Sequence, residues 1–336
     1  MTASGRVVVV SSFPPRHCGI GAYAAAQVAG MREAGSEVLV VSPPDGEGDV
    51  RVPFTHGRPF REALRRSRPQ DRVLVHFQPA LYDRRRDPIA KIRSALGLLR
   101  LCRRRPGTEV LVHEADRPRR WRPDHALLRA AFRAAPALVF HTDAERRALE
   151  RAYRVRVRGR LVEHTRGVRL SGRPSQEESR RALGIALDEP LLVCPGFLHP
   201  DKGLERAVAA FAAAGRGRLA IVGEVRDPTP ANTAYAARLR EQVERVPGAV
   251  LVEGYLPDAE FDAWIAAADA VVLPYRRSWS SGALARAQLL GTPAIVTAVG
   301  GLAEQAGDRD VVVADDRALA RAVARICGRG VGAEAG

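Results

Sequence analysis

The chain has 336 residues, of which 46% are hydrophobic and 27% charged, so it is long enough for two domains with ordinary globular cores. No apolar run reaches about 18 residues, which excludes a membrane-spanning helix, and the first residues lack the pattern of a secretory signal. We therefore expect a cytoplasmic protein. Its four cysteines are widely spaced, which predicts neither a disulfide framework nor a cysteine metal site: Cys18, Cys102, Cys194 and Cys327.

The formal net charge is +15, which suits an anionic partner such as nucleic acid, a membrane surface or a phosphorylated substrate. Only Lys91 and Lys202 are lysines, and such an arginine bias with abundant Ala, Gly and Pro is also what a GC-rich coding sequence produces. Basic runs lie at residues 84–86, 103–105 and 117–122. They leave open a peripheral contact with the inner membrane face, whereas no recognition motif supports a specific nucleic-acid partner.

Short apolar runs alternate with helical patterns through the first half of the chain. This alternation predicts a parallel sheet with helices on both faces. The expected strands are residues 6–12, 36–42, 72–77, 109–114 and 137–142. The expected helices are residues 22–34, 88–102, 124–134 and 143–152.

The rhythm breaks near Ser171 to Ser175, where Gly, Pro and Ser precede a short helix from about Gln176. We predict an N-terminal domain of residues 1–170 and a C-terminal domain of residues 171–336, both doubly wound, with ligands beyond the carboxyl ends of the strands. In the second domain the expected strands are 191–196, 218–223, 249–254, 270–274, 293–297 and 310–314. The expected helices are 204–214, 232–243, 258–268, 281–290 and 317–327.

Two loops of the second domain combine glycine with a side chain that suits a nucleotide. In PGFLHPDKGLERAV, Lys202 precedes a glycine and a helix, where backbone amides and the ammonium would favour a phosphate. A solvated loop lysine would give the same pattern. In VEGYLPDAE, Tyr255 and Leu256 offer an apolar edge to a flat base, and an ordinary capped turn is the alternative.

A third loop, in SWSSGALARAQLLGTP, places small hydroxyl residues at the start of a helix. Ser280, Ser281 and Gly282 follow a strand, and the first amides of a helix lack partners within the helix. The hydroxyls therefore either bind an anion or simply cap the helix. Arg286 lies further along the same helix, among alanines and leucines.

In order and spacing these segments resemble the retaining GT-B glycosyltransferases of glycosyltransferase family 4, group 1. The resemblance is carried by FPPRHCGIGAYAAAQVAGMREAGSEVLVVS, PGFLHPDKGLERAVAAF, LAIVGE, VEGYLPDAEFDAWIAAADAVVLPY and SSGALARAQLLGTPAIVTAVGGLAE, and it covers nearly the whole chain. It implies two Rossmann-like domains facing across a cleft. It also implies transfer of a sugar from a nucleotide-diphosphate donor to a hydroxyl acceptor, with retention and without a metal or cofactor.

The resemblance assigns roles to residues that match the family's motifs. A histidine after an N-domain strand lies near the anomeric centre, which favours His113 over His76 and His141, although each could be a strand-end residue bonded to backbone. His113 and Lys202 are the catalytic candidates, and His76 and Glu114 are expected on the acceptor side. The expected donor-binding residues are Gly19, Gly21, Gly196, Lys202, Tyr255, Leu256, Ser278, Ser280, Ser281, Gly282 and Arg286.

Three positions depart from the family's pattern. Phe197 stands where the family has an arginine, directly after the glycine that opens the lysine loop. Ser278 and Arg286 occupy the places of two glutamates that hold donor hydroxyls, and a guanidinium cannot accept a hydrogen bond. We predict that Arg286 is a replacement cation for the donor phosphates or pairs with an acid such as Glu253. The departures also favour a relative that binds a sugar nucleotide or another phosphorylated ligand without normal transfer.

Overall fold

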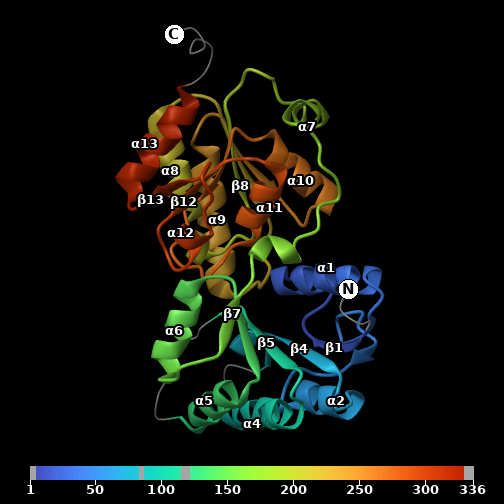
Figure 1. Cartoon of the computed structure of the whole chain (residues 1–336). Helices are drawn as coiled ribbons and strands as arrows, with labels where there is room; N and C mark the ends of the chain where they lie inside the picture. The colour runs from blue at the N-terminus through green and yellow to red at the C-terminus, as the bar shows by residue number, and fades with distance from the viewer. Residues whose placement is uncertain (1–4, 83–86, 115–121, 329–336) are drawn as a thin grey trace. The chain divides into compact units, whose positions relative to one another are not determined.

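The computed structural model describes residues 5–82, 87–114 and 122–328. The chain divides into two compact units, Met1–Val168 (unit 1) and Arg169–Gly336 (unit 2), each built around one parallel sheet (Figure 1). The division lies two residues before the boundary expected from the sequence. Each unit is a Rossmann-like α/β domain, as predicted.

Seven parallel strands form the sheet of unit 1, in the order β3-β2-β1-β4-β5-β6-β7. Chain order reverses between β1 and β4, the place where doubly wound sheets open a crevice at the carboxyl ends of their strands. The two central strands are runs of buried apolar residues, as expected for a sheet covered on both faces. The strands are β1 (Arg6–Val10), β2 (Glu37–Ser42), β3 (Val50–Arg51), β4 (Arg72–Phe77), β5 (Thr108–Val112), β6 (Ala137–Phe140) and β7 (Gly159–Leu161).

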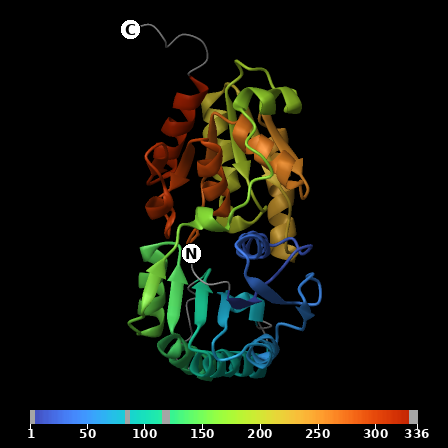
Figure 2. The ribbon, with the colours of Figure 1, turned by 45° about the vertical axis from the view of Figure 1, so that its right-hand side comes forward.

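Helix α1 covers one face of this sheet, and it buries Tyr23 and Val28 against the apolar residues that alternate along the strands. Helices α2, α4 and α5 pack together on the other side of the strands, and Figure 2 views α1 nearly along its axis. The elements are α1 (Gly19–Glu33), α2 (Arg58–Arg66), α3 (Pro79–Tyr82), α4 (Pro88–Arg104), α5 (Pro123–Ala134), α6 (Asp143–Tyr153) and the 3-10 turn η1 (His164–Gly167).

Unit 2 contains six parallel strands in the order β10-β9-β8-β11-β12-β13. They are β8 (Leu191–Pro195), β9 (Arg218–Gly223), β10 (Ala249–Glu253), β11 (Ala270–Leu273), β12 (Ala294–Thr297) and β13 (Val311–Val313). One face packs in a single apolar cluster against α8 (Leu204–Ala214), α9 (Pro230–Glu244) and α13 (Asp316–Cys327). The other face packs against α7 (Gln176–Leu183), α10 (Asp258–Ala267), α11 (Gly282–Leu290) and α12 (Leu302–Gln305).

The structure describes part of the basic runs and all four cysteines. Arg105, directly after α4, donates hydrogen bonds to the carbonyls of Leu64 and Ser67. This arginine of the 103–105 run therefore stabilises the fold of unit 1. Residues 84–86 and 117–121 lie outside the described residues. All four cysteines are buried and unpaired. In the parts of the chain that the structure describes, no helix is long and apolar enough to cross a membrane.

Candidate functional site

Lys202 is held over a buried aromatic ring in unit 2. It ends the 3-10 turn η2 (Pro200–Lys202) after β8, and its Nζ lies 3.7 Å from the centre of the Tyr275 ring. This cation–π contact holds the ammonium in place, and no carboxylate of the described ranges pairs with it. The Tyr275 hydroxyl lies 3.4 Å from Ser281 Oγ at the start of α11. One ring therefore connects the lysine to the helix start that the sequence indicates as a phosphate site.

The lysine loop and the loop after β11 are bonded through their backbones. The amides of Arg276 and Arg277 donate to the Asp201 carbonyl at 2.8 and 3.2 Å. Gly203 has a φ of +58°, and a Cβ there would lie 2.4 Å from the Pro274 carbonyl oxygen. Only glycine permits this approach, so the two loops behave as one rigid piece.

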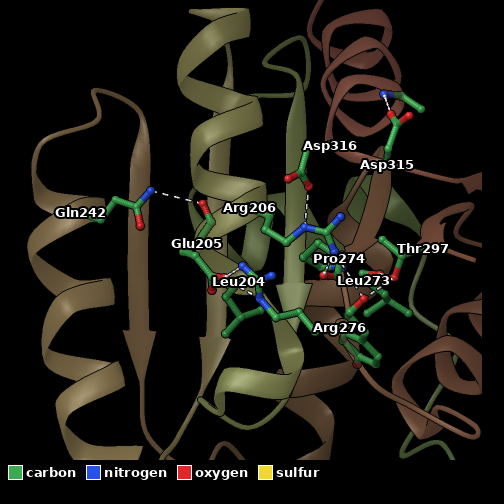
Figure 3. A network of polar contacts seen from close by, with 12 residues as sticks. Leu204, Glu205, Arg206, Gln242, Leu273, Pro274, Arg276, Thr297, Asp315 and Asp316 are labelled. Atoms are coloured by element: carbon green, nitrogen blue, oxygen red, sulfur yellow. Dashed lines mark hydrogen bonds and ion pairs between the residues drawn. The ribbon is translucent and has the colours of Figure 1, made fainter. Parts of the chain in front are cut away.

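Two ion pairs anchor the same loops to the helices of unit 2 (Figure 3). Arg206 of α8 donates to the Pro274 carbonyl at 2.8 Å and pairs with Asp316 of α13 at 2.5 Å. Arg276 pairs with Glu205 of α8 at 2.6 Å. Because these guanidinium groups already have partners, we infer that they position the lysine loop instead of binding a ligand.

The start of α11 is capped by its own neighbours. The Ser281 hydroxyl accepts from the Leu284 amide at 3.2 Å, and the Ser281 amide donates to Gln305 Oε1 at 2.7 Å. Ser281 is buried, so its expected phosphate contact would have to replace one of these bonds. Gly282 is exposed, and its amide and the next one have no intrahelical acceptor, which leaves them to receive an anion.

Ser278 and Ser280 lie in the partly exposed loop before α11. The Ser278 hydroxyl donates to the Ser280 carbonyl at 2.8 Å. Gly300 packs on this loop with a φ of +57°, and a Cβ there would lie only 1.6 Å from the Ser278 carbonyl oxygen. The loop is therefore fixed by close backbone packing, and the Ser278 hydroxyl is used locally.

Arg286 is bound by two aspartates of α10. It pairs with Asp262 and, at 3.3 Å, with Asp258, and its side chain is only 13% exposed. The Asp262 carboxylate is 1% exposed and also accepts from the Ser171 amide and hydroxyl at 2.9 and 3.0 Å. The expected pairing with an acidic residue is confirmed, but Glu253, the suggested partner, is wrong, because an arginine of α9 binds that carboxylate at 2.7 Å. Arg286 thus ties α11 to α10, and its donor role stays a prediction.

The remaining donor-side positions lie after β8 and β10. Tyr255 is 51% exposed beside Gly254, whose φ is +147°, while Leu256 packs partly into the core. A ring so exposed is open to stacking by a base. Gly196 has a φ of +130°. A Cβ on Gly223 would lie 1.8 Å from the carbonyl oxygen of Gly196. The ends of β8 and β9 therefore meet closely behind the lysine loop.

Sequence reasoning missed Arg226, which follows β9. Its guanidinium lies over the ring of Phe197, 5.3 Å from the ring centre, and pairs with Asp227 at 3.1 Å. Burial lowers the pKa of His199, and the positive charges of Lys202 and Arg226 add to this effect. Arg226 is thus a second cation near the lysine loop. Because it lies about 25 residues from Lys202 in sequence, only the pairing of β8 with β9 brings it there.

In unit 1, four histidine rings surround Tyr23 near the carboxyl ends of β4, β5 and β6. Their centres lie 5.1–5.9 Å from the Tyr23 ring, and they belong to His76, His113, His141 and His164. Nδ1 of His76 and Nε2 of His113 are 3.0 Å apart. We call these four rings the histidine cluster. Sequence reasoning missed His164, because it lies in η1, beyond the short strand β7.

Burial keeps the histidine cluster neutral. It lowers the pKa of His76 to about 3 and the pKa values of His113 and His164 well below 6.5, with smaller contributions from neighbouring histidines. Burial also lowers the pKa of His141. Four polar atoms are buried and have no hydrogen-bond partner among the residues that the structure describes: Tyr23 Oη, His76 Nε2, His141 Nε2 and His164 Nδ1. The cluster therefore offers neutral donors and acceptors, which suits hydroxyl groups better than a charged ligand.

Two carboxyl groups lie next to the histidine cluster. Glu114 accepts from Gln78 Nε2 at 2.8 Å. Glu145 is fully buried, accepts from the His141 amide at 3.1 Å, and has a pKa raised by burial to about 8. Within the described ranges, no group of three or more His, Cys, Asp or Glu is arranged to hold a metal ion.

Two glycines of unit 1 were expected near the donor. Gly19 begins α1, and a Cβ there would meet no atom within 4 Å. Gly21 is buried, and a Cβ there would lie 3.3 Å from the Phe13 amide nitrogen. Close packing thus restricts Gly21, whereas Gly19 has open space beside it.

Comparison with known proteins identifies the class of the fold. Residues 189–329 match the family described as Glycosyl transferases group 1, and no curated protein matches the chain in sequence. A sucrose-phosphate synthase from Thermosynechococcus elongatus is similar in structure, with 18% identity, a TM-score of 0.71 and coverage of 97% of this chain and 90% of that one.

Two further solved structures are similar over comparable lengths. A UDP-forming trehalose-phosphate synthase from Burkholderia xenovorans shares 14% identity, with a TM-score of 0.70 and coverage of 98% and 92%. Anabaena HepE, in complex with UDP-glucose, shares 15% identity, with a TM-score of 0.67 and coverage of 97% and 90%. The chain therefore has the predicted GT-B fold, and the match to the group 1 glycosyltransferase family lies within unit 2.

Proposed function

We propose that this protein is a retaining, family 4 glycosyltransferase that moves a sugar from a nucleotide-diphosphate donor to a hydroxyl of a glycan, lipid or natural product. The observation that carries the proposal is Lys202, held over buried Tyr275 beside the start of α11 within the matched domain. Solved neighbours in complex with UDP, UDP-glucose or ADP support a nucleotide donor. We place its action in the cytoplasm, and the net charge of +15 supports peripheral contact with an anionic membrane face.

The proposed reaction needs no nucleophile from the protein. The bond between the anomeric carbon and the donor diphosphate breaks, and the acceptor oxygen bonds to that carbon on the same face. The acceptor proton passes to the departing diphosphate. Lys202 and the free amides at the start of α11 stabilise the negative charge on this leaving group. No step requires a metal ion or cofactor.

The unit 1 residues would orient the sugar and the acceptor. His113 is neutral and partly exposed, so it can bond a hydroxyl directly. His76 has no exposed surface, and we therefore assign it an indirect role, in which its 3.0 Å bond to His113 sets the orientation of that ring. Glu114 is the proposed acceptor-side carboxylate. In unit 2, Tyr255 is proposed to stack on the nucleobase.

A second candidate function is binding of a sugar nucleotide without normal transfer. It is favoured by Arg286, which stands where the resembled family has a carboxylate and is bound to two aspartates. Slow release of nucleoside diphosphate from a donor in water distinguishes the two functions. A transferase leaks sugar to water, whereas a protein that only binds leaves the donor intact.

We expect Lys202→Met to weaken binding of nucleoside diphosphate at least 10-fold, about 1.4 kcal/mol or more, because a charge-assisted contact to phosphate is lost. The melting temperature should change little, since the methionine side chain can still pack on Tyr275. Calorimetric titration with UDP, ADP and GDP measures the effect. Lys91→Met is the matched control, because it removes the only other lysine, which lies in α4 of unit 1. Unchanged affinity in a folded Lys202→Met variant would refute the donor role.

A further inference from the structure

A cavity of about 460 Å³ lies within unit 1, on the face of the sheet that α1 covers. This volume is within the range of small-molecule sites, about 300–1,000 Å³. Its apolar wall comes from consecutive strands, with Leu74 of β4, Leu111 of β5 and Val139 of β6. The α1 wall is formed by Tyr23, Gln27 and Met31, which are spaced four residues apart and so share one side of the helix.

Two buried polar atoms on the α1 wall have no hydrogen-bond partner within the described part of the chain. They are the hydroxyl of Tyr23, a residue that is 3% exposed, and Oε1 of Gln27. A buried polar atom left without a hydrogen bond costs about 1–3 kcal/mol. A ligand with a donor for Gln27 and a polar group for Tyr23 would recover this cost, whereas an apolar ligand would not.

The rim of the cavity carries more positive than negative charge. Arg72 and Arg160 share the Glu109 carboxylate at 3.2 and 2.6 Å. Arg166 and Glu163 also line the cavity, and neither has an ion-pair partner among the residues that the structure describes. A guanidinium without a carboxylate partner favours a phosphate, which it can bind through two parallel hydrogen bonds. The two carboxylates are acceptors for hydroxyl groups.

We propose that this cavity binds a small sugar phosphate, separately from the sugar-nucleotide donor. The phosphate contacts Arg166 and Arg160, and the hydroxyls bond to Tyr23 and Gln27. The sugar ring lies on the apolar wall. The proposal goes beyond glycosyl transfer, because the cavity contains none of the residues assigned above to the donor or the acceptor. Since Tyr23 also contacts the histidine cluster, a ligand in the cavity alters the surroundings of those rings.

Titration of the full-length protein with glucose 6-phosphate, glucose and inorganic phosphate tests this site. We expect glucose 6-phosphate to bind at least 10-fold more tightly than either of the others and to shift the NMR resonances of the histidine-cluster rings. Arg166→Ala should lower its affinity at least 10-fold, and Tyr23→Phe should lower it several-fold while keeping the ring. Arg156→Ala is the control, because Arg156 is exposed and does not line the cavity.

A second variant separates this site from the proposed donor site. Lys202→Met should leave glucose 6-phosphate binding unchanged while it weakens nucleoside diphosphate. Absence of glucose 6-phosphate binding would overturn the proposal, as would binding that survives Arg166→Ala or is lost in Lys202→Met. Equal affinity for inorganic phosphate would overturn the assignment to a sugar phosphate. The affinity for nucleoside diphosphate is measured separately, so failure of the sugar-phosphate site is distinct from failure of the proposed transferase function.

Discussion

Acidification from pH 7.5 to pH 5 should remove about 2 kcal/mol or more of the stability that the histidine cluster contributes to unit 1, because the cluster is buried in its neutral form. The pKa of His76 is about 3 in the folded protein and 6.5 in the unfolded chain. The unfolded chain therefore binds a proton at pH 5 that the folded chain does not. This contribution to stability is complete above pH 6.5 and is lost as pH falls toward 3. His76 alone accounts for about 2 kcal/mol at pH 5, and His113 and His164 act in the same direction.

Urea unfolding at several pH values, followed by amide exchange in β4 and β5, measures this dependence. His76→Gln should flatten the loss of stability below pH 6.5, whereas His17→Gln, at an exposed position, should leave it unchanged. Glu145 should act in the opposite direction. Its pKa is raised to about 8, so its contribution is complete below its ordinary value near 4.5 and is lost as pH rises through 8. A loss of stability below pH 6.5 that is the same in His76→Gln as in the unsubstituted protein would contradict the buried neutral cluster.

Arg286→Met should destabilise unit 2 by about 3–5 kcal/mol, the second large effect that we expect. The change leaves Asp262, whose carboxylate is 1% exposed, as a buried charge without its cation. The Ser171 hydrogen bonds remain, but they do not neutralise the charge. Denaturant unfolding of the full chain measures the loss. Arg181→Met is the matched control, because its ion pair with Glu177 is exposed and should contribute less than about 1 kcal/mol.

A second substitution of Arg286 distinguishes a structural role from a role in donor binding. Arg286→Glu should destabilise the fold further, because it places a third carboxylate beside Asp258 and Asp262. If Arg286 binds the donor, this variant also loses affinity for nucleoside diphosphate under conditions where it is folded. Unchanged affinity in the folded variant would refute the donor role, and unchanged stability would refute the structural ion pair.

The regular elements were predictable because their patterns are local. The run at residues 72–77 and the helix at residues 204–214 agree with β4 and α8 residue for residue. The missed elements lack such a pattern. β7 has only three residues, all exposed, and α2 is so rich in arginine that its buried side, Pro59, Phe60 and Ala63, is hidden in the sequence.

The site was only partly predictable, because its contacts join distant segments. Lys202 stands out in the sequence as one of two lysines, but its contact with Tyr275 depends on β8 lying beside β11. In the sequence, Arg286 looks like a cation available to a ligand. Only the packing of α10 on α11 shows that two aspartates bind it. The histidine cluster combines residues from four segments of the chain, and no spacing in the sequence indicates that Tyr23 lies among them.

The proposed reaction is sugar transfer from a nucleotide-diphosphate donor, with retention and without a metal ion. The most direct measurement is NMR of the full-length protein with a panel of nucleotide sugars and hydroxyl acceptors, in the presence of a chelator. We predict release of nucleoside diphosphate and a product whose anomeric configuration matches that of the donor, both strongly reduced in Lys202→Met. A product of inverted configuration, a requirement for added metal, or no nucleoside diphosphate released from any donor would contradict the proposed function.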